Sequence, residues 1–80
     1  MEEFEKLFIE LASSFEPIHQ AELSSRGLEY TPDNVIMLWK EFDEFIQEGF
    51  GTTSLIYAMM KALIDWKIEQ LAMDIQILES

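Results

Sequence analysis

Glu16 and His19 are the one pair of side chains whose types and spacing match a metal-binding motif. Two Glu-x-x-His pairs and two further glutamates, all facing inward, bind the metals of di-metal four-helix bundles. This sequence has a single histidine, and Pro17 lies inside the pair. A second copy of the chain would have to supply the second motif. We therefore expect no metal site and no cofactor.

Other catalytic arrangements also lack support in the sequence. There is no cysteine, no glycine-rich phosphate loop, and no serine in a pattern typical of a nucleophile. His19, the only histidine, is expected to be an exposed side chain near a turn. Most carboxylates fall on polar faces, away from the apolar cleft that separates the pKa values of a catalytic pair. We predict no catalytic residues and no enzyme activity.

The chain is strongly acidic, and its charge is unevenly spread. Sixteen Asp and Glu accompany five Lys and Arg, which gives a net charge of -11. Residues 1–50 have twelve acidic and three basic side chains, a net of -9, whereas residues 51–80 have a net of -2. Direct nucleic-acid binding is disfavoured because it requires cations that face phosphates. A basic protein partner is the matching choice, and the alternative is that the charge only keeps a small apolar protein soluble.

Residues 32–48 predict an amphipathic helix with an acidic outer side. Thr31 can cap its first turn, Pro32 suits the first helical position, and Gly49 is expected to end it. Its apolar stripe consists of Val35, Leu38, Trp39, Phe42, Phe45 and Ile46. Four acidic residues follow steps of eight, three and four, which puts Asp33, Glu41, Glu44 and Glu48 on one side. Neighbours in such a row lie about 5–6 Å apart, a spacing near the phosphate repeat of a nucleic-acid strand. The row predicts either a DNA-mimic surface or an ordinary solvated face.

Residues 53–78 predict one long helix with two apolar faces. The stretch 52–78 contains no Pro or Gly, and one of Thr52, Thr53 and Ser54 can cap its first turn. Its first apolar face contains Ile56, Met59, Leu63, Trp66, Met73 and Ile77. Its second contains Tyr57, Met60, Ile64, Ile68, Leu71, Ile75 and Leu78. Together the faces span roughly 200° of the helix, whereas a surface helix typically needs a stripe of about 100°.

A helix this apolar requires cover on two sides. Either the rest of the chain covers both faces, or one face meets a second copy or another partner. An 80-residue chain without disulfides has a small core, and such domains often gain stability by forming oligomers. We therefore expect a homo-oligomer, with a dimer favoured. The candidate residues for self-association are Trp66, Ile68, Leu71, Met73, Ile75 and Ile77.

Two further helices are predicted before Gly27, over residues 2–15 and 17–26. A break is expected at Glu16–Pro17, because the residue before proline is pushed out of the helical region and proline lacks an amide hydrogen. Gly27 should then end the second helix in a left-handed conformation. The predicted fold is all-α: a small helical bundle of three main helices plus one short helix, with the long C-terminal helix at its centre. Residues 1–80 are expected to form a single helical domain.

Size, charge and hydropathy together limit where the protein acts and which class of function it can have. The start, MEEFEKLF, is acidic and does not resemble an export signal, and no run of about 18 uncharged apolar residues exists. We expect a cytoplasmic protein that does not cross a membrane. The function that we predict is a small acidic interaction module, DNA-mimic-like or of the phage anti-defence type, that binds and modulates or inhibits a basic, nucleic-acid-handling partner. The alternative is a structural or assembly protein that self-associates through the long C-terminal helix.

Overall fold

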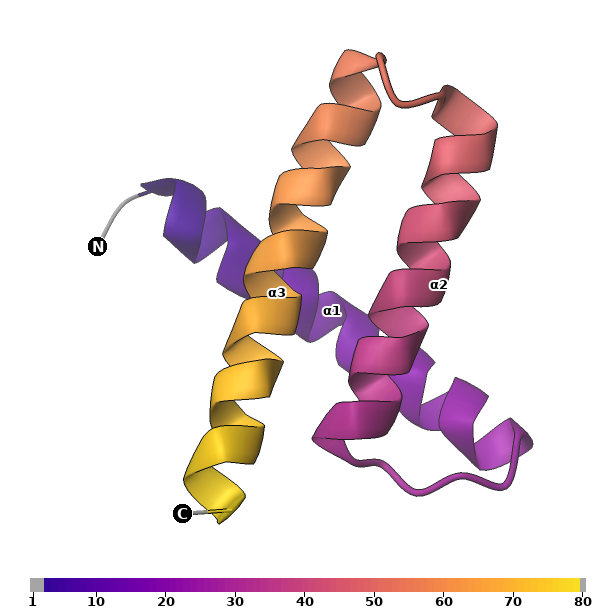
Figure 1. Ribbon diagram of the computed structural model, residues 1–80, viewed down its shortest axis with the longest axis vertical. Coiled ribbons are helices and arrows are strands. Elements are labelled where there is room, and N and C mark those ends of the chain that lie inside the picture. Colours follow the sequence, from indigo (N-terminus) through magenta and orange to yellow (C-terminus); the bar gives the residue numbers. More distant parts are fainter. Residues whose placement is uncertain (1–2, 80) are drawn as a thin grey trace. The chain divides into compact units, whose positions relative to one another are not determined.

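The computed structural model describes residues 3–79, apart from the side chains of Phe4, Leu78 and Glu79. Within this range the chain forms three α-helices and no strand: α1 (Glu3–Ser25), α2 (Pro32–Phe50) and α3 (Leu55–Glu79) (Figure 1). The all-α prediction is confirmed. Tertiary contacts divide the chain into two units, Met1–Tyr30 with α1 and Thr31–Ser80 with α2 and α3. The predicted helix start at residue 2 and the side chain of Leu78 lie outside the described part.

The helix α1 continues through Pro17, so the predicted break and the separate short helix over 17–26 are wrong. Proline has no amide hydrogen, and the carbonyl of Ser13 therefore receives no helical hydrogen bond from residue 17. Ser13 and Pro17 are both exposed, so water can bond to that carbonyl instead. A backbone carbonyl that water can reach does not have to be paired within the protein.

The C-terminus of α1 follows the prediction for Gly27. This glycine has a φ of +73°, and its amide donates a hydrogen bond to the carbonyl of Ser24 at 3.1 Å. The amide of Leu28 donates to the carbonyl of Leu23 at 2.9 Å. These two bonds form a Schellman motif, which satisfies carbonyls that the helix itself leaves without partners.

The second unit is an antiparallel hairpin of α2 and α3, which lie side by side and are joined by residues 51–54 (Figure 1). The predicted start of α2 is confirmed, because the hydroxyl of Thr31 accepts a hydrogen bond from the amide of Asn34 at 3.2 Å. The predicted stop at Gly49 is wrong. The helix continues to Phe50, and Gly51, with a φ of +80°, is the residue whose positive φ ends it.

The first turn of α3 is capped by Ser54. Its hydroxyl accepts a hydrogen bond from the amide of Tyr57 at 3.1 Å, and its carbonyl accepts one from the amide of Ala58 at 3.1 Å. Among the three candidate capping residues, Ser54 is thus the one used.

None of the helices in residues 3–79 combines the length and apolar character that crossing a membrane requires.

Both helices of the hairpin contribute buried apolar side chains to its interior. The largest is Trp39, whose ring meets that of Phe42 edge to face, with 6.3 Å between the ring centres. The buried side chains of the hairpin are Val35, Leu38, Trp39 and Ile46 of α2 and Tyr57, Leu63, Ile64 and Leu71 of α3. Burial of these residues fixes which side of α2 faces away from the interior.

Candidate functional site

The four acidic residues predicted on one side of α2 all have exposed side chains. We call Asp33, Glu41, Glu44 and Glu48 the acidic row. At 3.6 residues per turn, Glu44 is about 180° from the buried Val35, so the row lies on the outer side of the hairpin. The Cβ atoms of Glu41, Glu44 and Glu48, at steps of three and four, lie about 5–6 Å apart along this side.

One aromatic residue lies among these carboxylates. Phe45 was predicted to belong to the buried stripe, but its side chain is 70% exposed, and that prediction is wrong. Phe45 is about 80° away from Val35 on the helix, at the edge of the packed side next to Glu41. Met37 lies on the same outer side, eight residues earlier, and is half-buried. The outer side of α2 is therefore both acidic and apolar.

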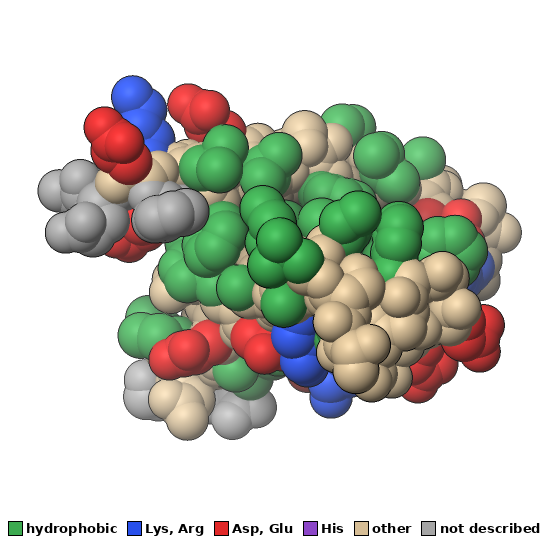
Figure 2. Space-filling model, turned by 90° about the horizontal axis from the view of Figure 1, so that it is seen from above, with side chains coloured by type: hydrophobic (Ala, Val, Ile, Leu, Met, Phe, Trp, Pro, Cys, Tyr) green, Lys and Arg blue, Asp and Glu red, His purple; other side chains and the backbone are tan. Residues whose placement is uncertain are grey.

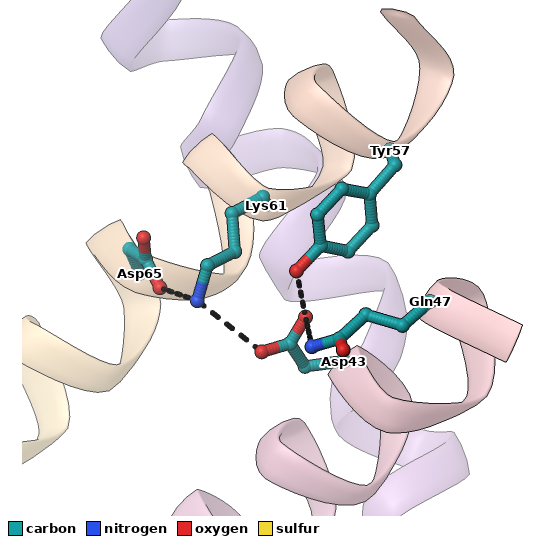
Figure 3. A network of polar contacts seen from close by, with 5 residues as sticks. All are labelled: Asp43, Gln47, Tyr57, Lys61 and Asp65. Carbon is teal, nitrogen blue, oxygen red and sulfur yellow. Dashed lines mark hydrogen bonds and ion pairs between the residues drawn. The ribbon is translucent and has the colours of Figure 1, made fainter. Parts of the chain in front are cut away.

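A polar network joins α2 to α3 on a different side of the hairpin (Figure 3). The carboxylate of Asp43 accepts hydrogen bonds from the Tyr57 hydroxyl at 2.9 Å and the Gln47 amide at 3.4 Å. Its other oxygen accepts one from the Lys61 ammonium at 3.2 Å. Lys61 also donates to Asp65 at 2.9 Å. Two of these bonds cross from one helix to the other, so the network helps to set how α2 and α3 are aligned.

The network shifts the pKa values of its members. Burial by itself would raise the pKa of Asp43, but the hydrogen bonds from Tyr57, Gln47 and Lys61 and the charge of Lys61 outweigh it, and the pKa is lowered. Burial and the bond to Asp43 raise the pKa of the Tyr57 hydroxyl. Hydrogen bonds to Asp65 and to Asp43 raise the pKa of Lys61. At neutral pH the network is therefore a carboxylate held by a neutral phenol and a cation, an arrangement suited to structure.

Sequence reasoning did not identify this network, although a signal for it exists. Tyr57, Lys61 and Asp65 are spaced four residues apart and so form one line along α3. Asp43 follows Phe42 directly at the edge of the apolar stripe of α2. In an antiparallel hairpin with a short loop, residues at similar distances from the loop lie near each other, which brings Asp43 close to Lys61.

The two predicted apolar faces of α3 have different environments. The second face is buried or half-buried at each described position, together with Leu63 of the first. Within the predicted self-association set, Leu71 is therefore a buried residue of the hairpin, and Trp66, Ile68 and Ile75 are half-buried. Met73 and Ile77 are exposed, and so are Leu55, Ile56 and Met59 nearer the start of α3. Figure 2 looks down on the loop end of the hairpin and shows hydrophobic side chains at the surface there.

His19 differs from its expected place. It lies in the interior of α1 rather than near a turn, it is buried, and its ring lies 5.7 Å from that of Phe15 between centroids. The prediction of an exposed histidine is wrong because it rested on the break at Pro17. Within residues 3–79, no group of three or more His, Asp and Glu side chains is placed to bind a metal ion.

Comparisons with known proteins give no family for this chain. No protein-family model matches it, and searches of the curated proteins and of the solved structures find no match. The acidic row, Phe45 and the exposed side of α3 are the features of the chain from which a function can be inferred.

Proposed function

We propose that this protein is a small acidic interaction module that binds a basic protein and thereby modulates or inhibits it. The observation that supports this proposal is the acidic row: all four of its carboxylates are exposed on the outer side of one helix. A net charge of -11 adds a long-range attraction toward a basic surface. The same charge repels nucleic acid and anionic membranes.

The spacing within the row suggests the class of partner. Like charges three and four residues apart on a helix lower its stability. A destabilising arrangement of this kind favours a functional role for these residues. A protein that handles nucleic acid has cations arranged to meet successive phosphates. Glu41, Glu44 and Glu48, with Cβ atoms about 5–6 Å apart, can occupy such a surface in place of a strand. We therefore propose a nucleic-acid-handling protein as the partner.

The hairpin presents the row on a well-supported helix. Trp39 and Ile46 are buried on the inner side of α2, and Asp43 is bonded to both Tyr57 and Lys61 of α3. Binding residues on a rigid element lose less conformational freedom on association than residues on a loop. This support allows four surface carboxylates to act together.

Charge reversal with a matched control tests the proposal. One variant replaces Glu41, Glu44 and Glu48 by Lys, and the other replaces the exposed Glu5, Glu10 and Glu16 of α1 by Lys. Both change the net charge by +6, from -11 to -5. Affinity capture from a cell lysate, quantified by mass spectrometry, should recover the same basic protein with the wild type and the α1 variant but not with the α2 variant. If both variants lost the captured protein to the same extent, net charge alone would determine binding, and a specific role for the acidic row would be refuted.

A second candidate function is self-assembly through α3. The observation that favours it is the exposure of Met73 and Ile77, which are four residues apart and therefore neighbours on one side of this helix. Contiguous exposed apolar surface on a small protein marks an interface more often than isolated exposed residues do. The two functions are compatible, because the acidic row lies on α2 and a dimer formed through α3 would display two such rows.

A further inference from the structure

Phe45 combines high exposure with a surround of negative charge. Its side chain is 70% exposed although it lies inside a 19-residue helix, five residues before the end. Glu41 and Glu48 lie four residues before it and three after it, which makes them its neighbours on the helix surface, and Glu44 directly precedes it. Large aromatic side chains are among the residues that contribute most to binding energy at protein interfaces, where polar groups around them form the rim.

Met37 gives this surface a second apolar point. Met37, Glu41 and Phe45 are spaced four residues apart and form one line along α2. Eight residues of helix separate Met37 from Phe45, which places them about 12 Å apart along the axis, or slightly more than two turns. The outer side of α2 thus presents two apolar contacts with carboxylates between and beside them, together with one exposed cation, Lys40, three residues after Met37. Sulfur-containing methionine adapts easily to the shape of a partner.

This pattern specifies the chemistry of the occupant. Nucleic acid and a second copy of the same surface are both repelled by the carboxylates. A helix with two apolar residues about two turns apart and with Lys or Arg on their flanks is complementary in both spacing and charge. Arginine fits best, since its planar group can bond to a carboxylate while it stacks on an aromatic ring.

We propose that the outer side of α2 is a docking surface for a basic amphipathic helix of the partner, with Phe45 as the apolar anchor. The proposal rests on the proposed function and adds the structural class of the partner's binding segment. Phe45 supplies the apolar contact, Met37 the second one, and Glu41, Glu44 and Glu48 pair with the flanking cations.

Two synthetic peptides and three variants test this docking surface. The first peptide is an arginine-rich amphipathic helix with two leucines two turns apart, and the second has glutamine at both leucine positions and the same charge. Each is titrated by calorimetry into the wild type, Phe45→Ser and Phe50→Ser. Phe50 is the matched control because it is 51% exposed but lies about 140° away from Phe45 on the helix. The third variant has Glu41, Glu44 and Glu48 replaced by Lys.

The wild type and Phe50→Ser should bind the leucine peptide about tenfold more tightly than the glutamine peptide, an affinity ratio within the range of one interface anchor. Phe45→Ser should remove this difference while its circular dichroism spectrum stays unchanged. The charge-reversed variant should bind both peptides weakly. Equal binding of the two peptides to the wild type, an unchanged preference in Phe45→Ser, or no binding of either peptide overturns the docking surface. Peptide binding that is unaffected by charge reversal would instead refute the proposed function.

Discussion

The hydroxyl of Tyr57 donates a hydrogen bond to the carboxylate of Asp43 at 2.9 Å, and this bond joins α3 to α2. Lys61, one turn after Tyr57, bonds to the same carboxylate at 3.2 Å. Two donors from one helix thus hold a single side chain of the other. Asp43 directly precedes Glu44, so fixing the side of α2 that carries Asp43 also fixes the outward direction of the acidic row.

Acid should weaken the contribution of Asp43 to stability. The pKa of Asp43 is lower in the folded protein than in the unfolded chain, where it is about 3.9. Near that pH the unfolded chain binds more protons, so the contribution is present above about pH 4 and is lost as the pH falls through the folded pKa. Asp43→Asn, which removes the charge but keeps the shape, should cost on the order of 1 kcal/mol at pH 7.

Urea denaturation of the wild type and Asp43→Asn between pH 3 and pH 7 measures this effect. The difference between their free energies of unfolding isolates Asp43 from the other carboxylates, which both proteins share. The difference should shrink below about pH 4, where the unfolded carboxyl is protonated. A difference that stays constant down to pH 3 would show that the charge on Asp43 contributes nothing.

The two glycines near the end of α2 should respond to alanine in opposite directions. Gly49 lies inside the helix, and a Cβ there would meet no atom within 4 Å. Gly49→Ala should therefore stabilise the protein by about 0.5–1 kcal/mol. Gly51 has φ +80° and ψ 155°, a region open almost only to glycine, so Gly51→Ala should cost about 1–3 kcal/mol. Thermal denaturation gives both values, and a stabilising Gly51→Ala would contradict the backbone conformation described for this loop.

Truncation of Ile64 should lower the stability of the hairpin far more than truncation of an exposed residue of the same helix. The side chain of Ile64 is fully buried, whereas that of Leu55 is exposed on the same helix. Ile64→Ala should cost about 2–5 kcal/mol, because it removes apolar contacts and leaves a cavity. Leu55→Ala should change the stability by less than about 0.5 kcal/mol. Denaturation at low protein concentration measures the free energy of unfolding of both variants. If both lost a similar amount of stability, the packed side of α3 would have been assigned wrongly.

Self-association through α3 can be tested by adding charge to its exposed apolar side. Met73→Glu with Ile77→Glu should convert an oligomer into a monomer, because burying two carboxylates in an apolar interface is unfavourable. Ala72→Glu with Gln76→Glu adds the same charge at exposed positions away from that side and should leave the mass unchanged. Light scattering at two salt concentrations measures the mass. A wild type that is monomeric at micromolar concentration would rule out assembly by this route.

Local signals in the sequence predicted most of the helices. The Thr31 cap, the helix start at Pro32 and the stop at Gly27 depend on side chains and backbone within a few residues, and all three are present. The exposure of the acidic row followed from helical spacing alone. Each of these features can be worked out without knowledge of which elements pack together.

The predictions that failed involve competition between local preferences. Pro17 disfavours a helix locally, but fourteen helical residues precede it, and extending an existing helix is easier than starting a new one. Ser13, whose carbonyl loses its helical partner, is an exposed residue. Gly49 and Gly51 can both end a helix, and the loop geometry decides between them. The Asp43 network depends on how α2 and α3 are aligned, which no single helix specifies, and the exposure of Phe45 depends on the width of the packed side.

The most direct measurement is an amide chemical-shift map of the protein, recorded by NMR as the arginine-rich leucine peptide is added. We predict that the largest shifts fall in α2, at Asp33, Met37, Glu41, Glu44, Phe45 and Glu48. The shifts should be small at the acidic residues of α1 and along α3. Shifts spread evenly over the acidic residues of both units, or concentrated on Met73 and Ile77, would contradict the role of the acidic row.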